Sequence, residues 1–256
     1  MHAFTDFLLH LKPEDLSTAQ FFFLIGLSGL TSMLNVIIGV GGGATLIAFM
    51  ITIMPAAAVI PVHAIVQLGS NAGRAVLMRR YIQKQFLGWF FVGSVVGAII
   101  GGNIALNLPT KYLELILAVF ILISSWVPIN LSFKGKKGLV GIGAFTAFLT
   151  MFVGATGPFL IATIKNILPD RRELGATMSC FMSIQHVIKA VIFGLLGFAY
   201  QQWIGVIGLM ILVGFMGTYI GKKVLDKVSN KHFHVVLKFA LTFIALRLIW
   251  GFLTAS

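Results

Sequence analysis

Long apolar runs follow one another along most of the chain, separated by short polar segments. Six of these runs have the length of one membrane-spanning helix and no internal break: residues 57–78, 86–108, 112–130, 174–199, 203–221 and 235–253. A helix that crosses the hydrocarbon core of a bilayer needs about 20 mainly apolar residues. The pattern therefore predicts an all-α membrane protein in which each run forms one transmembrane helix.

Two further apolar stretches are interrupted by glycine-rich segments. Residues 19–54 contain the run Gly39-Val-Gly-Gly-Gly, and residues 138–168 contain the run Gly154-Ala-Thr-Gly-Pro. Glycine is a weak helix former, and proline is favoured in the first turn of a helix. Both segments are therefore predicted to break a helix, so that each stretch forms a helical hairpin.

The basic residues favour hairpins that return to the side from which they entered. If each interrupted stretch crossed once, seven lysines and arginines would lie on one side and eight on the other. If each stretch returned, Lys12 and Lys111 would lie on one side and thirteen basic residues on the other: Arg79, Arg80, Lys84, Lys134, Lys136, Lys137, Lys165, Arg171, Arg172, Lys222, Lys223, Lys227 and Lys231. Because cytoplasmic loops carry an excess of Lys and Arg, we predict six full crossings, two re-entrant hairpins and both termini outside the cytoplasm.

The distribution of charge leaves one alternative open. If both arms of each hairpin spanned the membrane, every loop would lie on the same side as in the re-entrant arrangement. The second arms, at about 44–54 and 158–168, are short. Their length favours partial insertion, since a full crossing needs about 20 residues.

The two halves of the chain resemble each other. A shift of 115 residues places the two glycine-rich interruptions over one another, and it places residues 71–76 over 186–191. The charges of matching loops are out of phase, because the loop at 79–84 is basic and the segment 200–202 is uncharged. Three crossings separate the halves, so they are expected to lie upside down relative to each other.

The predicted architecture is one transmembrane domain, 1–256. It contains a first repeat at 18–131 and a second, inverted repeat at 138–253, each a broken re-entrant helical hairpin followed by three transmembrane helices. Inverted repeats with interrupted helices are typical of secondary transporters, in which the interruptions line the binding site.

Composition agrees with a membrane protein and excludes several other classes. Charged residues make up 10% of the chain, against about 25% in a soluble domain. Most of the basic residues behind the net charge of +12 lie between apolar runs, so the charge indicates membrane orientation and not a nucleic-acid partner. Cys180 is the only cysteine, and the few carboxylates lie near predicted helix ends. We therefore expect no metal, no cofactor and no enzymatic activity.

The breaks themselves are candidate anion sites. Backbone N–H groups freed at the start of a half-helix converge, and the helix dipole adds partial positive charge there. The candidate binding residues at the breaks are Gly41, Gly42, Gly43, Thr156 and Gly157. The alternative is that these glycines only allow close helix packing, which is also our interpretation of the glycines spaced by four at 93, 97, 101, 217 and 221.

Two apolar runs also carry a stripe of polar side chains. In residues 57–78 the stripe includes His63, Asn71 and Arg74, and in residues 174–199 it includes His186 and Lys189. We predict that Asn71, Arg74, His186 and Lys189 bind substrate, because ionisable groups within a membrane normally face a cavity or a partner. His63 and His186 are candidates for proton coupling. Alternatively, Arg74 extends to the lipid headgroups and the histidines are hydrogen-bonded core residues.

These motifs together resemble the TauE/SafE family of sulfite and organosulfonate exporters. The residues that carry the resemblance are the run Gly39-Val-Gly-Gly-Gly-Ala-Thr-Leu with Asn71 and Arg74 after it, and the run Gly154-Ala-Thr-Gly-Pro followed by Thr177-Met-Ser. The resemblance covers residues 20–253 and implies a multi-pass transporter of the bacterial inner membrane that exports sulfite, sulfoacetate or a related small anion.

The expected function is secondary transport of a small anion by alternating access around a site in the membrane midplane. Its partners would be the anionic substrate and membrane lipids. The alternatives are an anion channel of the same fold and a non-transporting membrane scaffold subunit. The substrate, the direction of transport, the coupling ion and the oligomeric state stay open.

Overall fold

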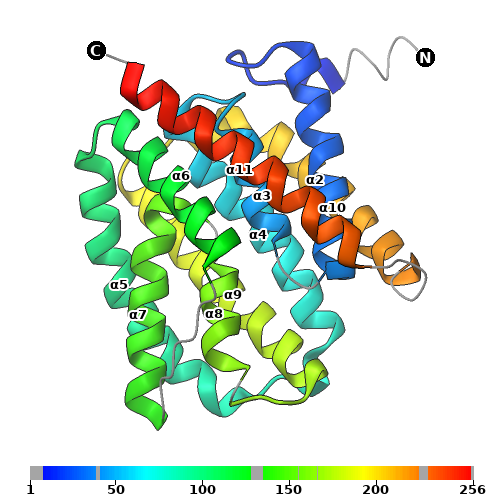
Figure 1. Ribbon diagram of the computed structural model, residues 1–256, viewed down its shortest axis with the longest axis vertical. Helices are drawn as coiled ribbons and strands as arrows, with labels where there is room; N and C mark the ends of the chain where they lie inside the picture. Colours follow the sequence, from blue (N-terminus) through cyan, green and yellow to red (C-terminus); the bar gives the residue numbers. More distant parts are fainter. Residues whose placement is uncertain are drawn as a thin grey trace.

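The computed structural model describes residues 8–38, 41–127, 135–154, 156–165, 167–224 and 230–254, and within these ranges it is helical without strands. Figure 1 shows the arrangement. The helices are α2 (Thr18–Ile38), α3 (Gly42–Met50), α4 (Ala56–Leu77), α5 (Leu87–Asn107), α6 (Thr110–Trp126), α7 (Gly135–Val153), α8 (Gly157–Ile164), α9 (Arg171–Leu195), α10 (Ile204–Val224) and α11 (Asn230–Thr254), with the 3-10 turns η1 (Arg79–Tyr81), η2 (Lys84–Phe86) and η3 (Tyr200–Trp203).

Both predicted helix breaks are confirmed. The first separates α2 from α3, and the second separates α7 from α8. Gly41 has φ 101° and Gly154 has φ 72°, a left-handed region that glycine adopts without steric cost. Gly39, Val40 and Ala155, which belong to the predicted breaks, lie outside the described residues.

The helix lengths identify a multi-pass membrane protein. Among the residues that the structure describes, five helical segments are long and apolar enough to cross a bilayer: Thr18–Val36, Lys84–Ala105, Gly135–Val153, Arg172–Leu195 and Tyr200–Gly221. By contrast, α3 has 9 residues and α8 has 8. At 1.5 Å per residue these short helices extend about 14 and 12 Å, less than half of a hydrocarbon core of about 30 Å. Each interrupted stretch therefore consists of a long first helix and a short second helix.

Helices from the two halves pack on each other. Helix α2 packs along α10, α5 packs along α7, and α6 contacts α11. Helices α4 and α9 pack side by side in the middle of the molecule, where α4 also contacts α10 and α9 also contacts α5 (Figure 1). The two polar stripes therefore lie on the central helix pair, away from the outer surface that faces lipid.

The close-packing role predicted for the glycines spaced by four is confirmed. A methyl group at Gly97 would overlap the backbone carbonyl of Ala144 in α7, and one at Gly217 would overlap the carbonyl of Gly29 in α2. Gly93 and Gly101 also face α7, and Gly221 faces α2. Only glycine lets these helix backbones approach so closely.

Candidate functional site

A fully buried group of polar side chains lies between the central helices and the two breaks. We call it the polar centre, and it consists of His63, Thr156, Gln185, His186 and Lys189. Each of these residues is at most 1% exposed. Burying polar groups costs free energy unless they find partners, so the contacts of each side chain indicate what the group can bind.

At the first break, α4 contacts the start of α3 through a histidine. The Nε2 atom of His63 lies 3.0 Å from the carbonyl oxygen of Gly43. A carbonyl oxygen can only accept a hydrogen bond, so Nε2 carries the proton and donates. The Nδ1 atom of His63 is buried and has no hydrogen-bond partner among the described residues.

At the second break, α9 contacts the end of α7 through a lysine. The Nζ atom of Lys189 donates to the carbonyl oxygen of Gly154 at 2.8 Å and to the hydroxyl of Thr150 at 3.3 Å. Both partners are uncharged. An ammonium group has three N–H donors, so one donor of Lys189 is left for a ligand.

The two breaks lie next to each other, although more than 100 residues separate them. A Cβ atom built on Gly154 would collide with the side chain of Ile47 in α3 and would lie 3.4 Å from the Nδ1 atom of His63. The rings of His63 and His186 meet edge to face with their centroids 6.0 Å apart. The structure thus brings together His63, His186 and Lys189, three of the residues that the sequence singled out.

The start of α8 is held by an amide side chain. The hydroxyl of Thr156 donates to Gln185 Oε1 at 3.3 Å, and Gln185 Nε2 donates to the hydroxyl of Thr146 at 2.7 Å. Gln185 and Thr150 were not among the predicted site residues. Gln185 lies beside His186 in the polar stripe of α9, but the contact of Thr150 with Lys189 joins two separate helices and leaves no signal in the sequence.

The remaining predicted residues lie around the polar centre or away from it. Gly42 and Gly157 begin α3 and α8, with Gly41 as the N-terminal cap of α3. A Cβ at Gly42 would overlap the backbone of Thr31 in α2, so close packing accounts for this glycine. Both half-helices nevertheless begin beside residues of the polar centre, so the positive ends of their dipoles lie near it.

Arg74 and Asn71 are not part of the polar centre. Arg74 follows His63 by eleven residues in the same helix, which is about 16 Å along the axis. Asn71 donates within α4 to the carbonyl of Gln67 at 2.9 Å. The Nη2 atom of Arg74 and the hydroxyl of Ser70 are buried without partners among the described residues, so this end of α4 has polar atoms of its own to satisfy.

The chemistry of the polar centre fits an anion. Both ring nitrogens of His186 are buried and have no partner in the described part of the chain. Leaving a buried polar group unpaired costs about 1–3 kcal/mol. Lys189 supplies a cationic donor and the His186 ring supplies an N–H donor, whereas the N–H of His63 is already bonded to a backbone carbonyl. The described residues contain no cluster of His, Cys, Asp or Glu that could hold a metal ion.

Comparison with known proteins identifies the family. No curated protein and no solved structure matches the chain. The family model described as sulfite exporter TauE/SafE matches residues 23–248, which include both breaks and every residue of the polar centre. The match covers nearly all of the 256 residues. The chain therefore belongs to the TauE/SafE family of sulfite exporters.

Proposed function

We propose that this protein is a secondary transporter that exports a small sulfur-containing anion and binds it in the polar centre. Family membership implies a membrane transporter of the sulfite or sulfonate exporter type. The observation that carries the assignment of the site is Lys189, which is completely buried and bonded only to uncharged oxygens. An unpaired cation is costly inside a membrane protein, and a bound anion would compensate it.

The proposed architecture is a pair of inverted repeats at 18–131 and 138–253. The order of helix lengths supports it, because a long helix, a short helix and three longer ones occur in the first half and again in the second. Packing supports it too, since α2 pairs with α10 as α7 pairs with α5. We assign α3 and α8 as the short arms of re-entrant hairpins. We also assign the side of the membrane that carries the thirteen basic residues to the cytoplasm of a bacterial cell.

Alternating access would require one end of the central helix pair to open while the other closes. One end is tied by two contacts. Arg172 Nη1 donates to the hydroxyl of Tyr81 at 3.3 Å, and the backbone N–H of Gln83 donates to the hydroxyl of Thr177 at 3.0 Å. These bonds join the beginning of α9 to the segment after α4. They are exposed or partly buried, so a modest rearrangement could break them.

The driving force need not include a coupled ion. Expelling a negative charge from a negative-inside cell is favoured by roughly 2.3 kcal/mol per charge per 100 mV. His63 and His186 remain our candidates for proton coupling, because their rings touch and their nitrogens are incompletely bonded.

Uptake into proteoliposomes tests the function. Purified protein would be assayed with ³⁵S-labelled sulfite, thiosulfate and sulfoacetate, beside Lys189→Ala and Arg74→Ala. We expect saturable uptake by the wild type and a loss of at least about tenfold in Lys189→Ala, because hydrogen bonds to charged groups contribute about 1.5–3 kcal/mol. Flux that does not saturate would indicate a channel, and no flux would indicate a scaffold. Full activity of Lys189→Ala would exclude the polar centre as the site.

Labelling of introduced cysteines tests the orientation. Lys136→Cys and Lys111→Cys would be made in a Cys180→Ser background and exposed to an impermeant thiol reagent in intact cells. We expect labelling from outside at position 111 and none at position 136. Labelling of both positions would contradict the re-entrant topology.

A further inference from the structure

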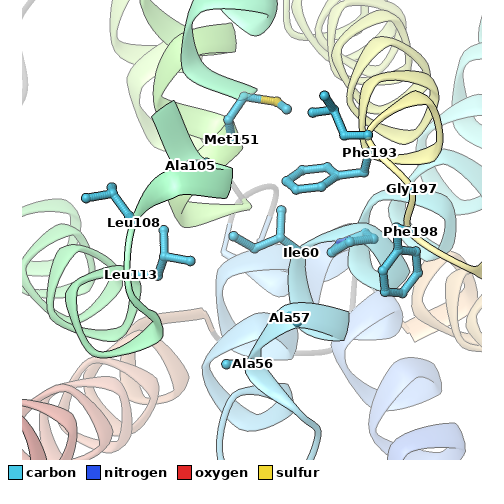
Figure 2. A pocket seen from close by; sticks show the side chains of 12 residues that line it. Ala56, Ala57, Ile60, Ala105, Leu108, Leu113, Met151, Phe193, Gly197 and Phe198 are labelled. Carbon is cyan, nitrogen blue, oxygen red and sulfur yellow. The ribbon is translucent and has the colours of Figure 1, made fainter. Parts of the chain in front are cut away.

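The two ends of the central helix pair offer an anion different surroundings. Next to the start of α4 and the end of α9 lies a cavity of about 300 Å³, and its twelve lining residues are all apolar. Figure 2 shows Ile60 of α4 and Phe193 of α9 at this cavity. An anion that entered it would lose hydration and find no side-chain donor, which is costly. This end of the pair therefore offers a charged substrate no side chain that could bind it.

The other end of the pair carries polar side chains instead. Two stripes lead away from the polar centre toward that end, at spacings of three and four residues: His63, Gln67, Ser70, Asn71 and Arg74 on α4, and His186, Ser183 and Ser179 on α9. Residues so spaced share one face of a helix. The rings of His63 and His186 touch and the two helices pack side by side, so the stripes lie on the faces that meet. Gln67, Asn71 and Ser179 are buried.

Two hydrogen-bond donors near the far end of the α4 stripe are buried without partners. They are the Nη2 atom of Arg74 and the hydroxyl of Ser70, which have no partner among the described residues. Arg74 follows Ser70 by four residues, so the two side chains share one face of α4. An arginine keeps its charge in proteins, and its guanidinium can donate two parallel bonds to one oxyanion. A small oxyanion is thus a ligand that would satisfy both groups.

Arg74 also lies just inside the contacts that close this end of the pair. Met78, four residues further along, faces Gly175 of α9, and the bond from Arg172 to Tyr81 lies beyond it in the chain. The side chain of Arg74 as a whole is partly exposed, although its Nη2 atom is buried. An anion that entered at this end would therefore meet Arg74 first and His63 eleven residues, or about 16 Å, further along α4.

We propose that Arg74 and Ser70 form a loading site, at which a small oxyanion from the cytoplasm binds before it moves along the two stripes to Lys189. This inference rests on the proposed function and adds a second binding site to it. The loading site binds more weakly than the polar centre, because a partly exposed cation attracts an anion less strongly than the fully buried Lys189 does. Weak binding agrees with this role, since an ion on a transport route must also be able to leave each site.

An anionic lipid is another source of the same chemistry, because its phosphate is also an oxyanion. Arg74 is three residues from the end of α4 at Leu77, and an arginine side chain there can extend to a headgroup. The burial of Arg74 Nη2 and of the Ser70 hydroxyl favours a small mobile anion, since a headgroup attached to acyl chains cannot follow the stripes into the protein. The experiment below separates the two sources.

The first measurement is sulfite uptake into everted membrane vesicles from cells that express the full chain, with vesicles from cells lacking it as the background. The cytoplasmic face of such vesicles is outside. We expect Arg74→Met to lower kcat/KM for ³⁵S-labelled sulfite by at least about tenfold, because a hydrogen bond to a charged group contributes at least that factor. Equilibrium binding of sulfite at the polar centre of the purified variant should change by less than about threefold, because distant sites act nearly independently. A merely structural role of Arg74 would lower both quantities.

Three further variants locate the effect. Arg74→Lys keeps the charge and should recover most of the loss, because a lysine ammonium still binds an anion. Arg80→Met removes one charge from the same end of the pair at an exposed position and should behave as wild type, because exposed charges are screened by salt. Ser70→Ala should lower kcat/KM by about threefold, since a neutral hydrogen bond contributes less than a charged one. It also tests the site should Arg74→Met assemble poorly.

Lipid composition distinguishes a mobile anion from a headgroup. Purified wild type and Arg74→Met would be reconstituted in pure phosphatidylcholine and in phosphatidylcholine mixed with phosphatidylglycerol. We expect Arg74→Met to lose sulfite uptake to the same extent in both. A loss that occurs only with phosphatidylglycerol would assign Arg74 to a lipid phosphate and overturn the loading site.

The outcomes separate this inference from the function on which it rests. A wild-type kcat/KM in Arg74→Met, or an equal loss in Arg80→Met, would overturn the loading site while sulfite uptake upheld the transporter. No uptake of sulfite, thiosulfate or sulfoacetate by the wild type would overturn the proposed function and the loading site together.

Discussion

The two helix breaks have the same construction but different chemistry. In each, a side chain from the central helix of that half bonds a backbone carbonyl at the break. His63 of α4 bonds Gly43, and Lys189 of α9 bonds Gly154. An imidazole can be neutral and can exchange donor for acceptor, whereas a lysine ammonium only donates. The two breaks are therefore built alike, but a cationic lysine bonds the backbone at one and a histidine imidazole bonds it at the other.

The cationic residues of α4 and α9 also differ in place. A shift of 115 residues aligns Arg74 with Lys189. The two helices are antiparallel, because His63 touches His186 while Gly175 faces Met78. Arg74 and Lys189 are equally far from the first residues of their helices. Because the helices are antiparallel, the two side chains lie at opposite ends of the pair. Repetition of a sequence motif in a protein of this kind thus need not yield two equivalent sites.

The largest expected effect contrasts these two cations. Lys189→Met removes the charge but keeps a long apolar side chain, and we expect sulfite affinity to fall roughly 100-fold, since a hydrogen bond to a charged group contributes up to about 3 kcal/mol. Arg74→Met should change affinity by less than about threefold, because Arg74 lies outside the polar centre. Equilibrium binding of labelled sulfite to purified protein measures both, and a greater loss in Arg74→Met would move the site to the other end of α4.

A comparison of two glycines tests how closely the second break packs against α3. Gly154 and Gly197 both have positive φ, but a Cβ at Gly154 meets Ile47 whereas one at Gly197 meets open space. We expect Gly154→Ala to lower the free energy of unfolding by about 3 kcal/mol, from backbone strain and overpacking combined. Gly197→Ala should cost about 1 kcal/mol, from strain alone. Denaturant unfolding in mild detergent would give both values, and equal losses would mean that the breaks are not in contact.

A third comparison concerns the helix pairs that flank the centre. Gly97→Ala in α5 and Gly217→Ala in α10 should each destabilise the protein by about 1–3 kcal/mol, since a methyl group overlaps a neighbouring backbone in both cases. Gly208→Ala in α10, which meets nothing within 4 Å, should be neutral or stabilising by up to about 1 kcal/mol. Unequal losses of unfolding free energy in Gly97→Ala and Gly217→Ala would show that the α5–α7 and α2–α10 pairs do not contribute equally to stability.

The smallest effect concerns how the central helices begin. Helix α4 follows Pro55 without a side-chain cap, whereas Asp170 caps α9 by accepting from the backbone N–H groups of Glu173 and Arg172. The pKa of Asp170 lies below its ordinary value. The main cause is the hydrogen bond from the backbone of Glu173, and the next is that from the backbone of Arg172. The stabilisation is thus complete above that ordinary value and fades as the pH falls through the lowered one.

Thermal unfolding checks this prediction. At neutral pH, Asp170→Ala should melt slightly below wild type, and Asp170→Asn should melt closer to it, because asparagine is also a good N-terminal cap. The difference between Asp170→Ala and wild type should shrink as the pH falls below about 4, near the ordinary pKa of an aspartate. A difference that is independent of pH would exclude the carboxylate as its cause.

Much of this protein can be read from its residues alone. Apolar runs, glycine-rich interruptions and basic loops are local features, and hydrocarbon imposes strong rules on helix length and on backbone hydrogen bonds. They were enough to place the helices and both breaks, and to choose His63, His186 and Lys189. The same periodicity that marks a polar stripe also says which face of a helix is buried.

Only the tertiary structure decided which residues of the two stripes meet. Periodicity assigns a face but not the level at which antiparallel helices cross, and that level is set by contacts between α4, α9 and their neighbours. It puts His63 and Lys189 at the breaks and leaves Arg74 about 16 Å along the axis from His63. The bond from Lys189 to Thr150 and the apolar cavity likewise exist only once separate helices have packed together.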